Sequence, residues 1–215
     1  MTMLRNQNNY AIQAEYAKGL FLKYDQEQMI RKLSLKADEE YLYLPFLDYE
    51  YRIHRATASV GKRLEDGTFA DGNSFNEVLT IFDVLCYSKE GSRLSGEWAG
   101  IAALGNNIHS SNGGYDFFSA AAKRLEPYED RLDALFQRLG GRKMPVGEPG
   151  YVLFAFPQLP VYIQYWRGDE EFPPQLRFLL DGNATEIIHY ETMYYLIDVL
   201  MQRLMELLQM MEERA

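Results

Sequence analysis

Cysteine and histidine are scarce in this sequence. Its 215 residues include one cysteine, Cys86, and three histidines. A disulfide needs two cysteines, and such low usage is typical of proteins from a reducing cytoplasm. Zinc and iron sites usually take several ligands at short spacing, whereas His54, His109 and His189 lie far apart. Glu50 precedes His54 closely enough to share a strand face with it, and we expect an ion pair or a lining pair there instead of a metal site.

Long apolar runs and an excess of positive charge are also missing. No run approaches the roughly 20 residues that span a bilayer, and the first ten residues lack the apolar centre of a secretory signal. Lysine and arginine total 22 against 31 acidic residues, which gives a net charge of −9. Because nucleic acids and anionic membranes attract clustered positive charge, we expect neither as a partner. We expect a cytoplasmic protein.

Recognisable catalytic motifs are absent as well. The sequence contains neither a Gly-x-Ser-x-Gly nucleophile elbow nor a glycine-rich phosphate loop. Cys86 falls on a helix that we predict to be buried, which is a poor position for a nucleophile. The sequence therefore predicts no catalytic residue and no metal ligand, and it leaves the cofactor and any enzymatic activity open.

Aromatic residues are abundant, with tyrosine foremost. Hydrophobic residues make up 47% of the chain and aromatic residues 14%, including sixteen tyrosines. This composition indicates a globular protein, and no linker-like stretch divides it, so we expect one domain over residues 1–215. Buried tyrosines need partners for their hydroxyl groups, so we expect a core threaded with hydrogen bonds or a pocket with a polar mouth.

Local patterns predict an α+β fold with about five antiparallel strands covered by helices. Capping boxes at Asp25 and Gln28 and at Ser74 and Glu77 predict the starts of two helices, and Gly140 is placed to end another. Gly61 to Gly72 is expected to be a polar loop. Aromatic and β-branched runs predict strands beginning near Tyr41, Tyr49, Tyr151, Val161 and Leu176. A long carboxy-terminal helix is expected to begin between Ala184 and Glu191.

The segment from Pro157 to Asp181 predicts a hairpin with a long acidic turn. Arg167-Gly168-Asp169 supplies the turn after an alternating strand, and the double proline that follows keeps the chain extended. Three acids, Asp169, Glu170 and Glu171, lie between Trp166 and Phe172. Two interpretations stay open: a solvated turn whose charges discourage edge-to-edge pairing, or a site for a cation or a basic partner.

Several of these residues resemble a known family. Trp166, the run Gly168 to Pro173 and the strand end Leu179 to Asp181 resemble the closing signature of an uncharacterised domain-of-unknown-function family, found mainly in anaerobic bacteria and archaea. Gly96-Glu97-Trp98 and Leu139-Gly140-Gly141 resemble two further elements of that family. The resemblance implies no established activity. Some relatives are fused to a cysteine-rich iron–sulfur domain, which implies anaerobic redox or corrinoid-related chemistry, but this chain has no such module.

A ligand pocket is the first functional hypothesis. The glycine-punctuated segment from Ser88 to Tyr115 is long and polar, as functional loops often are. In one interpretation its Glu97, Trp98 and His109 meet across a pocket mouth. An aromatic pocket built from Trp98 and Trp166 would then hold a small molecule or cofactor. The rim of that pocket comprises Glu97, His109, Asp169, Glu170 and Glu171. The structural alternative makes Trp98 a core anchor and His109 a partner of a loop carbonyl.

A protein-interaction module is the second hypothesis, and a hydrolase or transferase is a third. Apolar residues repeat at alternating three and four positions along the last helix. This stripe suits packing on the chain's own sheet and also suits a second copy or another protein partner. It comprises Ile197, Leu200, Leu204, Leu207 and Met211. A deep aromatic cavity containing His109 or Trp98 would favour a ligand, whereas a flat, exposed apolar face on Ile197 to Met211 would favour a partner.

Overall fold

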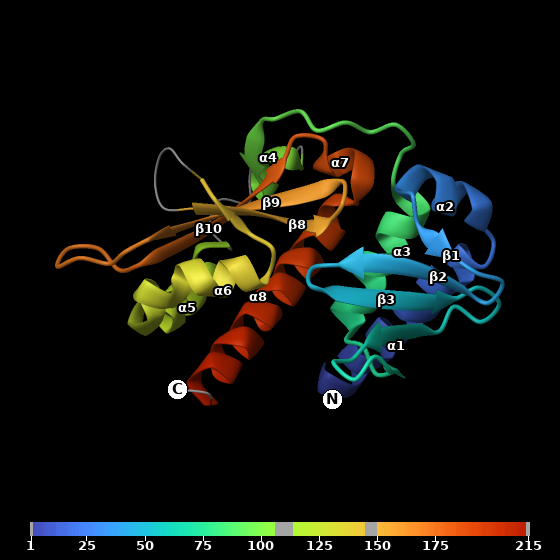
Figure 1. Cartoon of the computed structure of the whole chain (residues 1–215), viewed down its shortest axis with the longest axis horizontal. Coiled ribbons are helices and arrows are strands. Elements are labelled where there is room, and N and C mark those ends of the chain that lie inside the picture. The colour runs from blue at the N-terminus through green and yellow to red at the C-terminus, as the bar shows by residue number, and fades with distance from the viewer. Residues whose placement is uncertain (1, 106–113, 145–149, 214–215) are drawn as a thin grey trace. The chain divides into compact units, whose positions relative to one another are not determined.

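The computed structural model describes residues 2–105, 114–144 and 150–213 (Figure 1). The chain divides into two compact units, which are described separately. Unit 1 comprises Met1–Arg93 and Glu186–Leu196, and unit 2 comprises Leu94–Thr185 and Ile197–Ala215. That the chain forms one domain stays a prediction.

Unit 1 contains the first antiparallel sheet, whose strands follow the order β1-β2-β3-β4-β5. Its strands are β1 (Lys36–Ala37), β2 (Tyr41–Phe46), β3 (Tyr49–His54), β4 (Val60–Arg63) and β5 (Phe69–Ala70). Its helices are α1 (Thr2–Phe21), α2 (Gln26–Leu33) and α3 (Phe75–Tyr87). The stretch Glu186–Leu196 adds the end of α7 (Ala184–Ile187) and the start of α8 (Tyr190–Glu213).

Alternation along β2 and β3 gives this sheet one buried and one exposed face. Leu42, Leu44 and Ile53 are buried, while Tyr43 and Arg52 point to the other face. Figure 1 shows β2 and β3 on the viewer's side of α3. The predicted capping box at Ser74 and Glu77 is present and starts α3. The α3 helix packs on α1 through Phe82, whose ring centroid lies 5.4 Å from that of Phe21.

Unit 2 contains the second antiparallel sheet, in the order β6-β10-β9-β8-β7. Its strands are β6 (Trp98–Gly100), β7 (Arg142–Lys143), β8 (Gly150–Phe156), β9 (Leu159–Trp166) and β10 (Gln175–Asp181). Its helices are α4 (Ile101–Leu104), α5 (Gly114–Leu125), the 3₁₀ helix η1 (Glu126–Arg131), α6 (Leu132–Arg138) and α8 from Ile197 onward.

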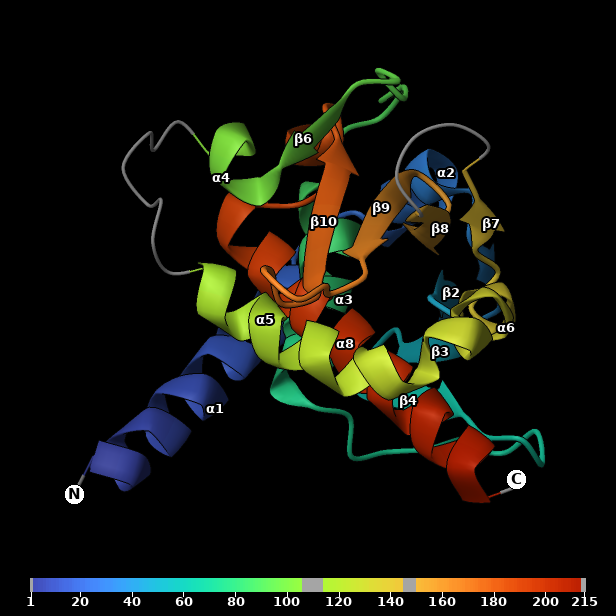
Figure 2. The same cartoon turned by 90° about the vertical axis from the view of Figure 1, so that its left-hand side faces the viewer.

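One face of the second sheet packs against helices. Tyr151, Ile163 and Phe178 are register partners on β8, β9 and β10, so their side chains share a face. Phe136 of α6 stacks on Tyr151 at 4.3 Å, and Phe118 of α5 contacts Phe178 at 5.1 Å between ring centroids. Figures 1 and 2 place α5, α6 and α8 on the same side of this sheet.

The predicted α+β class, the antiparallel pairing and the long carboxy-terminal helix are confirmed. The five expected strands are distributed over two sheets: β2 and β3 lie in the first, and β8, β9 and β10 lie in the second. Short strands with weak sequence patterns complete each sheet. The segment Gly61 to Gly72, expected to be a loop, contributes two of these, β4 and β5. None of the described helices is both long and apolar enough to cross a membrane.

Pairs of tyrosine and carboxylate recur in both units. In each pair the phenol donates a hydrogen bond to the acid, as expected for tyrosines that leave water. The pairs are Tyr43–Asp38, Tyr51–Glu77, Tyr128–Glu212, Tyr151–Asp133 and Tyr165–Glu129. Tyr51, Tyr151 and Tyr165 are buried, so the expected hydrogen bonds within the core are present for these three. The pairs of Tyr43 and Tyr128 lie at the surface.

Glu77 is the buried acid among these five. Its carboxylate accepts hydrogen bonds from Tyr51 Oη at 2.6 Å, Lys62 Nζ at 2.8 Å and the Ser74 backbone N–H at 2.6 Å. Burial alone raises the pKa of this carboxyl, but the bonds from Lys62, Tyr51 and Ser74 outweigh it and leave the pKa below its ordinary value. Glu77 therefore joins the start of α3 to β3 and β4.

Replacing Glu77 with alanine is expected to lower the free energy of unfolding by about 3 kcal/mol, because it leaves the Tyr51 hydroxyl and Lys62 without their acid. The exposed Glu65 offers a matched control, and Glu65→Ala is expected to change stability by less than about 0.5 kcal/mol. Denaturant titration at pH 7 measures both. Equal stabilities for the two variants would contradict this account of the buried acid.

Wild type and Glu77→Ala also test how the stabilisation by Glu77 depends on pH. A carboxyl whose pKa is lowered by folding stabilises the protein above its unfolded pKa of about 4.3, and this contribution is lost as the pH falls through the folded pKa. The stability difference between wild type and Glu77→Ala should therefore be complete at neutral pH and shrink in acid. A difference that stayed constant down to about pH 2 would contradict it.

Candidate functional site

The predicted acidic turn is stabilised by its own backbone. Asp169 Oδ1 accepts hydrogen bonds from the N–H groups of Glu171 at 2.9 Å and Phe172 at 2.7 Å. The side chains of Asp169, Glu170 and Glu171 are exposed. Trp166, at the end of β9, is half-buried, and the Arg177 guanidinium lies 5.2 Å from its ring centroid. Local bonds thus account for the shape of the turn.

The predicted Glu97 and Trp98 lie near the opposite end of β10. The Trp98 ring packs on Tyr162 with 5.4 Å between centroids. The backbone carbonyl of Glu97 accepts a hydrogen bond from Gly182 N–H at 2.9 Å, while the Glu97 side chain is exposed. These contacts attach the Gly96-Glu97-Trp98 segment to the end of β10.

Asp181 joins the Gly96-Glu97-Trp98 segment to the end of β10. Its buried carboxylate accepts hydrogen bonds from the backbone N–H groups of Ser95, Gly96 and Asn183, at 2.8, 2.9 and 3.0 Å, and from Ser95 Oγ at 2.9 Å. Burial by itself raises the pKa of this carboxyl, but these bonds outweigh burial and lower it. Two segments that carry the family resemblance therefore meet at one structural acid.

The two tryptophans are not brought together. Trp98 pairs with Asp181 and Trp166 pairs with Gln175, which are six residues apart along β10. This separation is roughly 20 Å at the rise of an extended strand. His109 lies outside the described residues. Ligand binding by Glu97, Trp98, His109, Trp166 and the acidic turn stays a prediction.

The apolar stripe of α8 is mostly buried. Ile197, Leu200, Leu204 and Leu207 are at most 1% exposed, and Met211 is half-buried. A partner could dock on this stripe only if the chain uncovered it. Docking of a second copy or another protein through α8 stays a prediction.

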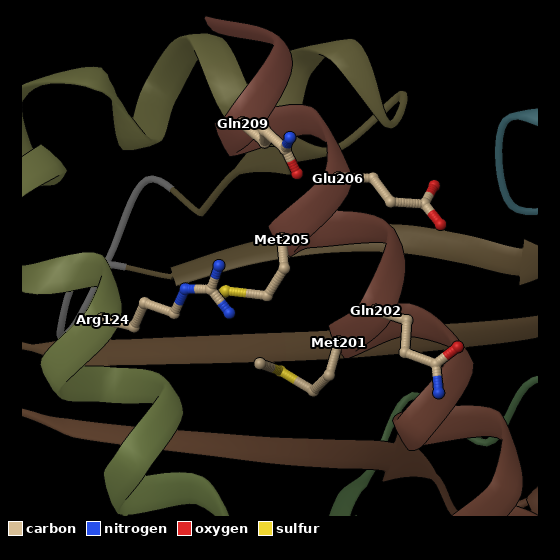
Figure 3. A pocket seen from close by; sticks show the side chains of 6 residues that line it. All are labelled: Arg124, Met201, Gln202, Met205, Glu206 and Gln209. Atoms are coloured by element: carbon tan, nitrogen blue, oxygen red, sulfur yellow. The ribbon is translucent and has the colours of Figure 1, made fainter. Parts of the chain in front are cut away.

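A hollow of about 380 Å³ lies between α5 and α8 in unit 2. Figure 3 shows Met201 and Met205 pointing toward Arg124, whereas Gln202 and Glu206 point away from it. Its polar side chains diverge, so the hollow offers Arg124 as a single cationic contact between two flexible thioethers. This arrangement gives a ligand little fixed geometry.

A larger aromatic cleft lies in unit 1, with a volume of about 480 Å³. Side chains of α1, α3 and the start of α8 form its walls. Its aromatic members are Tyr16, Tyr24, Phe82, Tyr87 and Tyr195, and its polar or charged members include Asp83, His189, Glu191 and Thr192. We call this feature the aromatic cleft. Its volume and its mixture of aromatic, aliphatic and polar lining residues are typical of small-molecule sites.

Asp83 and His189 form the polar centre of the aromatic cleft. Asp83 Oδ2 accepts a hydrogen bond from the His189 backbone N–H at 2.8 Å, and Asp83 Oδ1 lies 2.5 Å from His189 Nδ1. The imidazole also stacks on Tyr87, with 3.6 Å between centroids. The Asp83 side chain is 13% exposed and that of His189 is 55% exposed. The acid is therefore held inside the wall and presents the imidazole to solvent.

This geometry fixes which ring nitrogen is available. A carboxylate beside Nδ1 keeps the proton on that nitrogen, so Nε2 of the neutral ring carries the lone pair. An imidazole oriented in this way can accept a hydrogen bond, take up a proton or ligate a metal. Among the described residues, no group of three His, Cys, Asp or Glu side chains is arranged to hold a metal ion. Acceptance of a ligand's hydrogen bond or proton is thus the chemistry that the described residues support.

Cys86 also lines the aromatic cleft, but as a neutral thiol. Burial raises the pKa of this thiol to about 11, despite the opposing charge of Lys32. The Lys32 ammonium instead donates hydrogen bonds to the carbonyls of Cys86 at 3.3 Å and Ser88 at 2.8 Å, near the end of α3. The thiolate needed for nucleophilic attack is therefore scarce at neutral pH.

Sequence analysis missed the Asp83–His189 pair. The available local signal was helical spacing, which places Asp83, Cys86 and Tyr87 on one side of α3. Their partner His189 lies 106 positions away from Asp83. No spacing rule connects residues that far apart, so the tertiary fold was needed to bring them together.

Comparison with known families gives one match. The model of a family described as a domain of unknown function, DUF3786, matches residues 25–203. No curated protein and no solved structure matches the chain. The matched range includes Asp83 and His189, and it leaves out α1, which supplies one wall of the aromatic cleft.

The proton position on His189 is directly testable. In wild type the neutral ring should carry its proton on Nδ1, and Asp83→Ala should move it to Nε2, the nitrogen that normally holds it. Long-range ¹H–¹⁵N NMR correlation distinguishes the two forms. His54 is an internal control because its Nδ1 accepts a bond from Ala56 N–H at 3.1 Å, which places the proton on Nε2 in both proteins. An unchanged His189 pattern in Asp83→Ala would refute the assignment.

Proposed function

The chain belongs to the DUF3786 family, whose description assigns no activity, and we propose that it is a small-molecule-binding domain whose ligand occupies the aromatic cleft. The observation that carries this proposal is the Asp83–His189 pair, a fixed polar group exposed inside an aromatic wall. A pair with one half-exposed member contributes little to stability, because solvent screens its attraction. In the aromatic cleft the Asp83 carboxylate is mostly buried, whereas the His189 imidazole is accessible to a ligand.

The lining of the aromatic cleft indicates the class of ligand. Asp83 and Glu191 are acidic, and no described residue that lines the cleft is lysine or arginine. Aromatic ring faces carry negative potential and attract cations. The cleft therefore favours a neutral or cationic ligand over an anionic one. A hydroxyl or N–H donor on that ligand would bond to His189 Nε2.

The family resemblance adds a proposed setting. We infer that relatives occur in anaerobic bacteria and archaea and that some carry an iron–sulfur domain, which would make this chain an accessory domain of redox chemistry. A cluster is usually held by several cysteine thiolates, and the single Cys86 of these residues cannot supply them. We also infer a cytoplasmic location from this cysteine usage.

Binding can be tested without knowing the ligand. Protein purified without oxygen and examined by native mass spectrometry is expected to carry a small molecule, which denaturation releases for identification. In His189→Ala the affinity for that molecule should fall about tenfold or more, because one directed hydrogen bond is lost. Glu65→Ala is the control, since Glu65 is exposed and does not line the aromatic cleft.

Two outcomes would overturn the proposal. One is a released molecule that binds wild type and His189→Ala equally. The other is the absence of any bound molecule together with no rise in melting temperature across a panel of neutral and cationic metabolites. Because a ligand stabilises only the state that binds it, such a panel detects binding at concentrations well above Kd.

A further inference from the structure

The exposed face of the first sheet carries a second set of ordered polar groups. Arg52 lies on β3, with its guanidinium carbon 4.5 Å from the ring centroid of Tyr41 and 4.5 Å from that of Phe69. These rings come from β2 and β5, so three strands hold one side chain. A guanidinium held between two aromatic rings has its planar faces covered and its N–H edges exposed.

Gly61 lies beneath this arrangement. It is the register partner of Arg52 on β4. A Cβ atom at position 61 would lie 3.4 Å from Arg52 Nε and 3.4 Å from Phe69 Cβ, which is van der Waals distance. The Arg52 side chain therefore lies across β4 in close packing with Phe69. Because the side chain is already ordered, Arg52 loses less conformational entropy when it binds a ligand than a mobile arginine does.

Unlike the basic residues near it, Arg52 forms no ion pair with a described carboxylate. Lys62 pairs with Glu77, Arg63 with Glu50 and Arg55 with Glu27, at 2.8, 2.8 and 2.6 Å. No described carboxylate lies within ion-pair distance of Arg52, although acidic residues outnumber basic ones in the chain. Its five N–H donors are thus free of protein carboxylates in the part of the chain that the structure describes.

His54 adds a donor on the same face of β3. It lies two residues from Arg52, about 7 Å along the strand, and its ring packs edge-on against Tyr41 at 5.1 Å. Its Nδ1 accepts a hydrogen bond from Ala56 N–H, so the neutral ring has its proton on Nε2 and can donate it. Arg52 and His54 therefore both flank Tyr41 as hydrogen-bond donors.

Nearby acids are already engaged. Glu50, on the same face, pairs with Arg63. Asp38 accepts bonds from the backbone N–H groups of Glu40 and Tyr41 and from Tyr43 Oη. Asp38 keeps its negative charge but is occupied by these neutral donors, so Arg52 is the cation of this group that has no ion-pair partner among the described residues.

We propose that Arg52 and His54 form a binding site for the oxyanion group of a small ligand, a phosphate or a carboxylate. A guanidinium edge matches the two oxygens of either group, and charge-assisted bonds of this kind are among the stronger hydrogen bonds in proteins. Tyr41 and Phe69 orient the guanidinium and cover its faces. The site shares no residue with the aromatic cleft, and its charge preference is the opposite one.

NMR titration of the full chain with inorganic phosphate and, separately, with acetate tests this site at constant ionic strength. The Arg52 Nε–H signal and the His54 ring signals are expected to shift together and to saturate at millimolar concentrations. The probe that saturates at the lower concentration identifies the preferred oxyanion. Arg177 is the matched control, because its guanidinium lies over a single ring, that of Trp166.

Two variants separate the site from general charge attraction. Arg52→Lys keeps the charge but loses the planar fork, so binding should weaken about tenfold or more. Phe69→Leu removes one of the two rings that order the guanidinium, so binding should weaken several-fold. Saturable shifts of the His54 ring signals that both variants reduce would support the site. Shifts that do not saturate, Arg52 shifts that are matched at Arg177, or His54 shifts that persist unchanged in Arg52→Lys would overturn it.

Discussion

A charged group that leaves water has to be paired, and one buried acid in each unit shows how much structure this constraint fixes. Glu77 ties the first turn of α3 to β3 and β4 through Tyr51, Lys62 and Ser74. Asp181 ties the end of β10 to the segment before β6. In both cases the acid lies at the end of an element and bonds to a neighbouring segment of the same unit. Each acid therefore fixes how a sheet is placed against that segment.

The position of the aromatic cleft follows from the orientation of α3. The capping box and Glu77 fix where this helix begins, and Phe82 turns one side of it toward Phe21 of α1. Asp83 and Tyr87, one turn apart, then face the start of α8 and receive His189. The same packing that stabilises the helix therefore presents the imidazole, and no separate loop is needed to build the site.

The two proposed sites of unit 1 use histidine in opposite ways. Asp83 holds the proton of His189 on Nδ1 and leaves a lone pair on Nε2, in surroundings that are aromatic and acidic. The backbone N–H of Ala56 occupies Nδ1 of His54 and leaves a proton on Nε2, beside the unpaired charge of Arg52. One hydrogen bond to Nδ1 decides each case, so the neighbour of the ring and not the residue type sets the ligand preference.

Sequence patterns determined much of the local structure. The capping box at Ser74 and Glu77, the hairpin of β2 and β3 and the strands β8 to β10 follow from residues within a few positions of one another, because their hydrogen bonds and periodicity are local. The division into two sheets, the meeting of Asp83 with His189 and the placing of Phe69 over Arg52 were decided by tertiary structure alone. Those contacts join residues that are distant in sequence. Their formation depends on how whole elements pack, a long-range balance of burial against chain entropy that no short motif encodes.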